Sequence, residues 1–325
     1  MAIGPAPITR LACLMRAPNT FIIGAPKSGT TSLADYLAAH PAAYVCSPKE
    51  PFFWAEDYPG LAQRLGIRSL EEYLRLFSSA DARHEVVAEA STNYLCSRTA
   101  VSRIREYCPT ARFIVVLRDP VEVAHAFHME QVFAGNEDVT DFAAAWQLQE
   151  RRRRGDALPR ACWAPRFLQY EECVRFGEQV ERLLAEVEPR NVLFLRFEDV
   201  RADVAGVWAR VLEFLSLPPD GRREFPVSNA AHAHRLPGLA RFLFQPPGLL
   251  RAPVEALRAH LRQRRYAPIE FLKARLRRPV PRAAVVPAFE AELRRGLAPD
   301  IRKLQALLGW DLSAWSGESL ACARF

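Results

Sequence analysis

The feature that most constrains the fold is a short apolar run that leads directly into a turn of small and hydroxyl residues. Residues 20–24 read TFIIG, and the turn after them reads APKSG. Residues 31–39 then place Leu33, Tyr36 and Leu37 at helical spacing, so the segment predicts a buried strand, a tight loop and a helix. Such a unit gathers backbone N–H groups and a helix N-terminus around one point, which is the geometry of an anion site.

Apolar runs alternate with helical patterns through the first two thirds of the chain. The clearest is Phe113–Leu117, which is followed by Arg118, Asp119 and Pro120, and proline suits a first helical turn. The alternation predicts an α/β fold with a central, mainly parallel sheet flanked by helices. Further strands are expected at 86–88 and 192–195, and further helices at 171–188 and 200–215.

The composition limits the class of protein, the cellular compartment and the kind of ligand that can be expected. With 50% hydrophobic and 25% charged residues the chain has the composition of a globular protein, and no run approaches the roughly 18 apolar residues of a membrane span. Its seven cysteines form no CxxC pair, which predicts free thiols in a reducing cytoplasm and no zinc site. The net charge of +7 suits an anionic ligand. Because no basic stretch is interleaved with aromatic residues, a nucleic-acid partner is not expected.

Lysine is rare, and its placement is informative. Only four of the 44 basic residues are lysine, and Lys27 and Lys49 both lie in the first 50 residues. Because the chain uses arginine at nearly every other basic position, a lysine in a loop indicates that a compact point charge is needed there. The loop is not a Walker A sequence, because its lysine comes two residues before Gly29, and it is not GxGxxG. The residues predicted to hold the anion are Lys27, Ser28, Gly29, Thr30, Thr31 and Ser32.

Four blocks, in this order, resemble the sulfotransferases that use 3′-phosphoadenosine 5′-phosphosulfate (PAPS). GAPKSGTTSL is similar to the family's 5′-phosphosulfate loop, and SPKEPFFW to the KEPxFF segment of the carbohydrate and heparan branch. EASTNYL is similar to the ExSxxY segment, and FIVVLRDPVEVAHAF to the 3′-phosphate segment. The ending LLGWDLSAW resembles that of many bacterial members. The resemblance covers most of residues 20–220 and the last thirty residues, and is weakest over 220–287.

The resemblance implies a role for each block. Lys27 is expected to hold the 5′-phosphate and to neutralise the leaving oxygen during sulfuryl transfer, with no metal required. Glu89, at the end of an apolar strand, is expected to be the base that deprotonates the acceptor. Lys49 is expected to orient Glu89 or to contact the sulfuryl group. Arg118 is expected to bind the 3′-phosphate of PAPS.

One position departs from the family pattern. The family usually has a serine eight residues after the 3′-phosphate arginine, and this chain has Ala126 there. One hydroxyl contact to the 3′-phosphate is therefore missing. Arg235 is included among the donor-binding residues as a replacement, and His125 and His128 are further candidates.

The composition of the sequence changes after residue 217. The stretch 218–287 contains 11 of the 25 prolines and many arginines, which favours a cap over the site rather than more sheet. We predict a single sulfotransferase domain over 1–325, with the nucleotide-binding α/β core at 18–217 and the C-terminal helix, at 288–325, packed on it. An apolar piece at 242–250 and a basic run at 262–265 in the cap are compatible with a membrane or lipid-like acceptor.

The sequence therefore favours a cytoplasmic sulfotransferase that acts on a hydroxyl, or an amine, of a small-molecule or carbohydrate acceptor. Two alternatives stay open. One is a P-loop nucleotide kinase or NTPase, which the position of Lys27 and the lack of a Mg²⁺-type carboxylate cluster oppose. The other is an inactive protein of the same fold that binds anions, which the alanine at position 126 keeps in view. The sequence carries no signal for the identity of the acceptor or for the oligomeric state.

Overall fold

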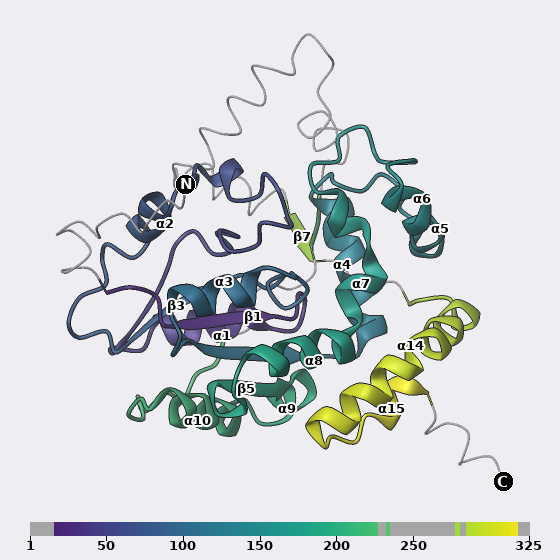
Figure 1. The fold of residues 1–325 in the computed structure, drawn as a ribbon. Helices are drawn as coiled ribbons and strands as arrows, with labels where there is room; N and C mark the ends of the chain where they lie inside the picture. Colours follow the sequence, from purple (N-terminus) through teal and green to yellow (C-terminus); the bar gives the residue numbers. More distant parts are fainter. Residues whose placement is uncertain (1–15, 227–231, 235–276, 280–283, 318–325) are drawn as a thin grey trace.

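A computed structural model describes residues 16–226, 232–234, 277–279 and 284–317. Its centre is a sheet of five strands, all parallel, in the order β2-β3-β1-β4-β5 (Figure 1). The predicted α/β fold with a parallel sheet is confirmed. Within this sheet, only β2, three residues long, has no counterpart among the predicted strands. The strands are β1 (Thr20–Gly24), β2 (Ala43–Val45), β3 (Val86–Ala90), β4 (Arg112–Leu117) and β5 (Val192–Arg196).

Helices cover both faces of the sheet, as the strand sequences require. Successive side chains of a strand point to opposite faces, and both sets are apolar here: Phe21 and Ile23 face one core, Ile22 the other. Helices α3, α4, α8 and α14 contribute to the first core, and α1 and α10 to the second. The helices are α1 (Thr30–Ala38), α2 (Leu70–Arg75), α3 (Ala100–Tyr107), α4 (Pro120–Phe133), α5 (Phe142–Gln147), α6 (Gln149–Arg153), α7 (Tyr170–Val174), α8 (Phe176–Glu186), α9 (Phe197–Ala202), α10 (Val204–Leu215), α14 (Pro287–Leu308) and α15 (Ser313–Ser316), with 3₁₀ turns at Gln63–Leu65, Pro165–Leu168 and Pro189–Asn191.

Two of the predicted helices are broken in the structure. The helix expected at 171–188 is divided at Arg175 into α7 and α8, and the one at 200–215 is divided at Asp203 into α9 and α10. Asp203 caps α10, because its side chain accepts a hydrogen bond from the backbone N–H of Gly206 at 2.8 Å. Both breaks leave the apolar faces of the segments on the core.

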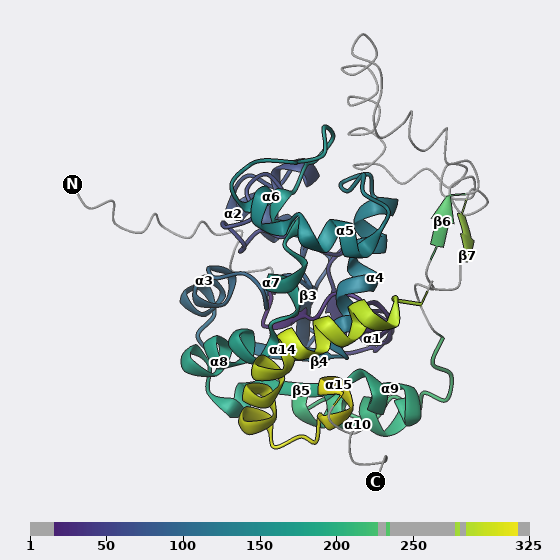
Figure 2. The ribbon, with the colours of Figure 1, turned by 90° about the vertical axis from the view of Figure 1, so that its right-hand side faces the viewer.

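The helix α14 packs along α8, far from it in the sequence (Figure 2). Asp300 of α14 accepts hydrogen bonds from the backbone N–H groups of Gly177 and Glu178, at 2.8 and 2.9 Å, and so caps α8 from outside. The contact needs a glycine, because a Cβ at Gly177 would lie 2.3 Å from the Asp300 carbonyl oxygen. Arg294 of α14 also reaches the start of α4, where it pairs with Asp119 at 2.8 Å.

Replacing Gly177 with alanine is expected to destabilise the protein by about 1–3 kcal/mol, since the added methyl group overlaps backbone rather than a movable side chain. Gly296 is a matched control on the partner helix: a Cβ there meets nothing within 4 Å. Gly296→Ala is expected to stabilise by about 0.4–1 kcal/mol, because alanine favours the helix. Urea unfolding of both variants measures the difference. Equal effects would contradict the close approach of α8 and α14.

Little of the predicted cap is described. Its described parts include β6 (His232–His234) and β7 (Arg277–Pro279), which pair in an antiparallel two-stranded sheet. Arg235, the apolar piece at 242–250 and the basic run at 262–265 lie outside the described residues. Among the helices that are described, none is long and apolar enough to cross a membrane.

Candidate active site

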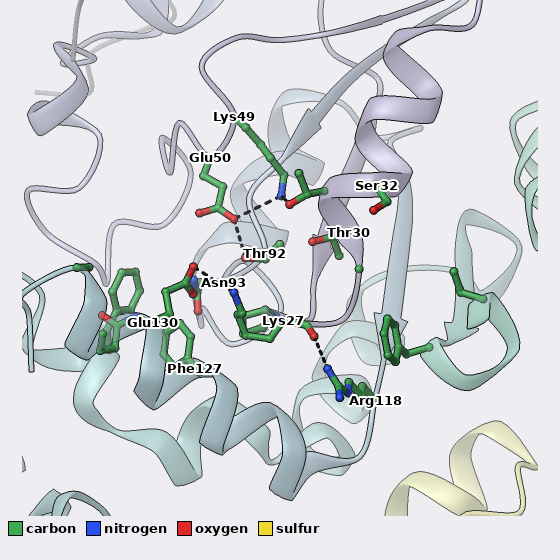
Figure 3. A pocket seen from close by; sticks show the side chains of 18 of the residues that line it. Lys27, Thr30, Ser32, Lys49, Glu50, Thr92, Asn93, Arg118, Phe127 and Glu130 are labelled. Atoms are coloured by element: carbon green, nitrogen blue, oxygen red, sulfur yellow. Dashed lines mark hydrogen bonds and ion pairs between the residues drawn. The ribbon is translucent and has the colours of Figure 1, made fainter. Parts of the chain in front are cut away.

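A cavity of about 800 Å³ opens at the carboxyl edge of the sheet, the edge at which open α/β sheets bind ligands. Each of the five strands is followed by a segment that lines it. Lys27 follows β1, Lys49 follows β2, Thr92 follows β3, Arg118 follows β4 and Phe197 follows β5. Figure 3 shows the polar groups of these segments around one space.

The loop after β1 turns sharply before α1 begins. Gly29 has a φ of 83°, a conformation that favours glycine, and a Cβ there would crowd the Phe197 ring at 3.1 Å. Gly29, Thr30, Thr31 and Ser32 all line the cavity, as predicted for an anion-binding loop. Ser28 does not, because its side chain is fully buried and its hydroxyl donates to the Pro26 carbonyl at 3.4 Å.

Both special lysines face the cavity. Lys27 Nζ lies 3.5 Å from Glu130 Oε1, and Lys49 Nζ donates to Thr31 Oγ1 at 2.9 Å (Figure 3). Lys49 also lies 3.7 Å from Glu50 Oε1. Of the two roles expected for Lys49, the structure does not show the first, orientation of Glu89, since the carboxylate beside Lys49 is that of Glu50. Contact with the sulfuryl group stays a prediction.

Glu50 is the residue that sequence reasoning missed. Its carboxylate lines the cavity, and Thr92 Oγ1 donates to Glu50 Oε1 at 2.9 Å. The side chain keeps 34% of its surface exposed, enough for contact with a ligand in the cavity. The available signal was its place in the KEPFFW block next to Lys49.

Glu89 does not line the cavity, and its predicted role as base is not supported by the structure. Along β3, Val87 and Glu89 point to the same face of the sheet, and Glu89 is fully buried there. The hydroxyl of Tyr73 donates to one carboxylate oxygen and that of Ser91 donates to the other at 2.7 Å. Burial raises the pKa of Glu89 to about 7, although these hydrogen bonds act in the opposite direction.

The buried glutamate instead anchors the segment that carries Glu50. Ser91 Oγ, which donates to Glu89, accepts a hydrogen bond from the backbone N–H of Phe52 at 3.3 Å. Tyr73, the other partner of Glu89, accepts one from the indole N–H of Trp54 at 2.9 Å. These bonds hold the segment that presents Glu50 on the core of the protein.

Replacing Glu89 with glutamine is expected to alter the pH dependence of stability. Because the pKa of Glu89 is raised from 4.5 to about 7 in the folded protein, the wild type loses stability as the pH rises through this window. The loss is on the order of 3 kcal/mol, and the glutamine variant lacks it. Melting temperatures at pH 5 and pH 8 should therefore differ less in Glu89→Gln than in the wild type, after comparison with a surface variant such as Glu213→Gln. The same pH dependence in all three proteins would contradict this assignment.

Arg118 lies at the opposite side of the loop from Glu130. Its Nη1 donates to the Lys27 carbonyl at 3.2 Å, its guanidinium lies 4.6 Å from the centre of the Phe197 ring, and Glu122 pairs with its other terminal nitrogen. Its buried Nε has no hydrogen-bond partner among the described residues. Arg118 lines the cavity and presents its positive charge to it.

The two histidines considered as replacements for the missing serine do not reach the cavity. The ring of His125 stacks on Phe142, with centroids 5.1 Å apart, and His128 is buried with Nε2 2.9 Å from the Val139 carbonyl. Neither lines the cavity, so this expectation is wrong. Ala126 itself is buried.

The chain is similar in sequence to known sulfotransferases. Human carbohydrate sulfotransferase 15 is 29% identical over 274 residues, which cover 68% of this chain and 48% of that protein. Mouse bifunctional heparan sulfate N-deacetylase/N-sulfotransferase 3 is 28% identical over 207 residues, 63% of this chain and 23% of that protein. The chain thus spans about half, or less, of the length of these curated relatives.

A solved structure matches over nearly the whole chain. The crystal structure of a sulfotransferase from Alicyclobacillus acidocaldarius has a TM-score of 0.67 and 25% sequence identity, covering 92% of this chain and 99% of that one. A sequence model of the sulfotransferase family matches residues 18–221, which include all five strands of the parallel sheet and every polar group described around the cavity. The chain therefore belongs to the sulfotransferase family.

Proposed function

We propose that the protein transfers a sulfuryl group from PAPS to a hydroxyl, or an amine, of a carbohydrate or small-molecule acceptor. The observation that carries this proposal is the placement of Lys27 and Glu50 in one cavity, beside a loop that opens a helix. A cation at the leaving oxygen and a carboxylate at the attacking group are what an in-line displacement needs. Sulfotransferase relatives that act on carbohydrate and heparan sulfate, by their names, support the reaction class.

The donor half of the cavity suits a nucleotide with two phosphate positions. The loop and the N-terminus of α1 offer backbone N–H groups and the hydroxyls of Thr30 and Thr31 to the 5′-phosphosulfate. Arg118 offers its guanidinium to the 3′-phosphate. Tyr36 and Phe225, whose rings contact edge to face with centroids 5.3 Å apart, also line the cavity and offer an aromatic surface for the adenine.

The chain's own groups account for the transfer step. Glu50 takes the proton of the acceptor hydroxyl as its oxygen attacks sulfur, and the bond from sulfur to the bridging phosphate oxygen breaks. The electron pair stays on the leaving adenosine 3′,5′-bisphosphate (PAP), where Lys27 neutralises the new charge. Lys49, held by Thr31 and near Glu50, is placed to contact the sulfuryl oxygens.

Arg118→Ala is expected to weaken PAP binding roughly 10- to 100-fold while changing 5′-AMP binding little, because a hydrogen-bonded charge pair contributes about 1.5–3 kcal/mol. Titration calorimetry with both nucleotides measures the selectivity. Arg75→Ala is the control, since Arg75 is exposed on α2, where it pairs with Glu71. Unchanged selectivity in Arg118→Ala would place the 3′-phosphate elsewhere.

Transfer of ³⁵S from labelled PAPS to an acceptor extract tests the function directly. The account expects labelled acceptor and PAP in equal amounts, with EDTA present, since the chemistry uses Lys27 in place of a metal. Release of PAP without labelled acceptor, or turnover of ATP instead of PAPS, would contradict it. Metal independence and a cytoplasmic location remain predictions from the sequence.

A further inference from the structure

One part of the cavity wall is aromatic. Phe52, Phe127, Trp163 and Phe167 all line it, and they form one cluster around Phe167. The centroid of the Phe167 ring lies 6.1 Å from that of Phe52, 5.6 Å from Phe127 and 5.7 Å from Trp163. These rings come from the segment after β2, from α4 and from the chain before α7. They make a surface on which a flat ring, or the apolar face of a sugar, can pack.

The charged groups near these rings are carboxylates, and each of them forms an ion pair with one of the two cavity lysines. Glu130, on α4 one turn beyond Phe127, lines the cavity beside Phe127 (Figure 3). Its ion-pair partner is Lys27, at 3.5 Å, and its side chain keeps 45% of its surface exposed. Arg64 stacks on the Trp163 ring at 4.6 Å but is not one of the residues that line the cavity.

Binding of the donor is expected to remove the positive charge that Lys27 now provides to Glu130. In the proposed function Lys27 neutralises the donor's phosphate and Lys49 contacts the sulfuryl group, so both lysines turn to the donor's negative charges. Of the described residues that line the cavity, the remaining cations are Arg118 and Arg201, which lie with Phe197 and Val200 on the donor side. As far as the described part of the chain goes, Glu130 is then a carboxylate that has lost its counter-ion Lys27, and it faces the space proposed for the acceptor.

We infer that the acceptor is a neutral or cationic compound with a flat or ring-shaped body, and that Glu130 selects against anionic acceptors. This inference rests on the proposed function and specifies the acceptor class of the same site. An acidic polysaccharide would bring its negative charges against Glu130 and Glu50 on the aromatic side. An amine, such as that of an amino sugar or an arylalkylamine, instead replaces the ammonium group of Lys27 beside Glu130.

Two matched series test the inference. The first is tyramine, 4-ethylphenol and 3-(4-hydroxyphenyl)propionate; the second is glucosamine, glucose and glucuronate. Each holds the body constant and changes the charge from positive through neutral to negative. Binding to the PAP-loaded protein is measured by calorimetry, and turnover with PAPS by PAP release. In at least one series we expect the cationic member to bind roughly tenfold or more tightly than the anionic member.

Glu130→Gln is expected to bring the two charged members within about threefold of each other. Glu213→Gln removes the same charge from an exposed position on α10 and is expected to keep the wild-type ranking. Preference for the anionic members, an unchanged ranking in Glu130→Gln, or no binding of any member to the PAP-loaded protein would overturn the inference. PAP binding is measured first and separates the two proposals: without it the proposed function fails, and with it only the acceptor class is at stake.

Discussion

Lys27→Ala is expected to lower the turnover number by about 10²–10³-fold, the loss seen when a donor that stabilises a developing oxyanion is removed. The ammonium group of Lys27 faces the cavity beside the loop after β1, where the donor's bridging oxygen is proposed to lie. Water that enters in its place cannot carry a fixed positive charge, so the barrier to breaking the sulfur–oxygen bond rises. PAP affinity is expected to fall as well, since the same group contacts the 5′-phosphate. Initial rates at saturating PAPS, with calorimetric titration of PAP, measure both effects.

The comparison for Lys27 is Lys303→Ala. Lys303 is an exposed lysine of α14 that pairs with Glu181 on α8, so its removal changes the net charge equally without touching the cavity. It is expected to leave turnover within about twofold, as for surface substitutions. Full activity in Lys27→Ala would rule out the loop lysine as the group that neutralises the leaving oxygen.

Glu50→Gln is expected to lower turnover by about 10²–10⁴-fold, the contribution of a positioned general base. Glutamine keeps the size of the side chain and can still accept the hydrogen bond from Thr92, but it cannot take a proton from the acceptor. PAP affinity is expected to stay within about threefold, because the carboxylate does not serve the nucleotide. Single-turnover rates separate this loss from any change in binding.

The variant to compare with Glu50→Gln is Glu89→Gln. Glu89 is buried and holds the segment that carries Glu50 through Ser91 and Tyr73, so its loss is expected to reduce turnover far less than that of Glu50. The sequence analysis assigned the role of base to Glu89 alone, whereas the position of Glu50 in the cavity favours Glu50. A larger loss of turnover in Glu89→Gln than in Glu50→Gln, with both proteins folded, would return the role of base to Glu89.

The sequence predicted the parts of the fold that depend on local pattern. The strands β1 and β4 are recognisable because both their faces are buried, which produces continuous apolar runs ended by glycine or by Arg118. The loop after β1 is recognisable because its residue types are those of an anion site. The three residues of β2 lack such a run, and partly exposed Tyr44 and Val45 give no clear signal.

Tertiary contacts decided what the sequence could not show. The break between α7 and α8 depends on Asp300, more than 120 residues away, which caps α8. Whether Glu89 faces the cavity or the core depends on which face of β3 holds the odd positions. Val87 and Ala88 are both apolar, so the pattern leaves that choice open. Glu50 reaches the cavity only because the segment after β2 folds back over β3, where the backbone N–H of Glu50 donates to Ala90 O at 3.0 Å.

The most direct test of the central claim is calorimetric titration of the protein with PAP and, separately, with 5′-AMP, without added metal. The two nucleotides differ only in the 3′-phosphate, which is assigned to Arg118. Micromolar binding of PAP, at least tenfold tighter than that of 5′-AMP, is the predicted result, in keeping with one charge-assisted phosphate contact. Equal affinity for the two nucleotides, or no binding of either, would contradict the assignment of this cavity to a PAPS donor.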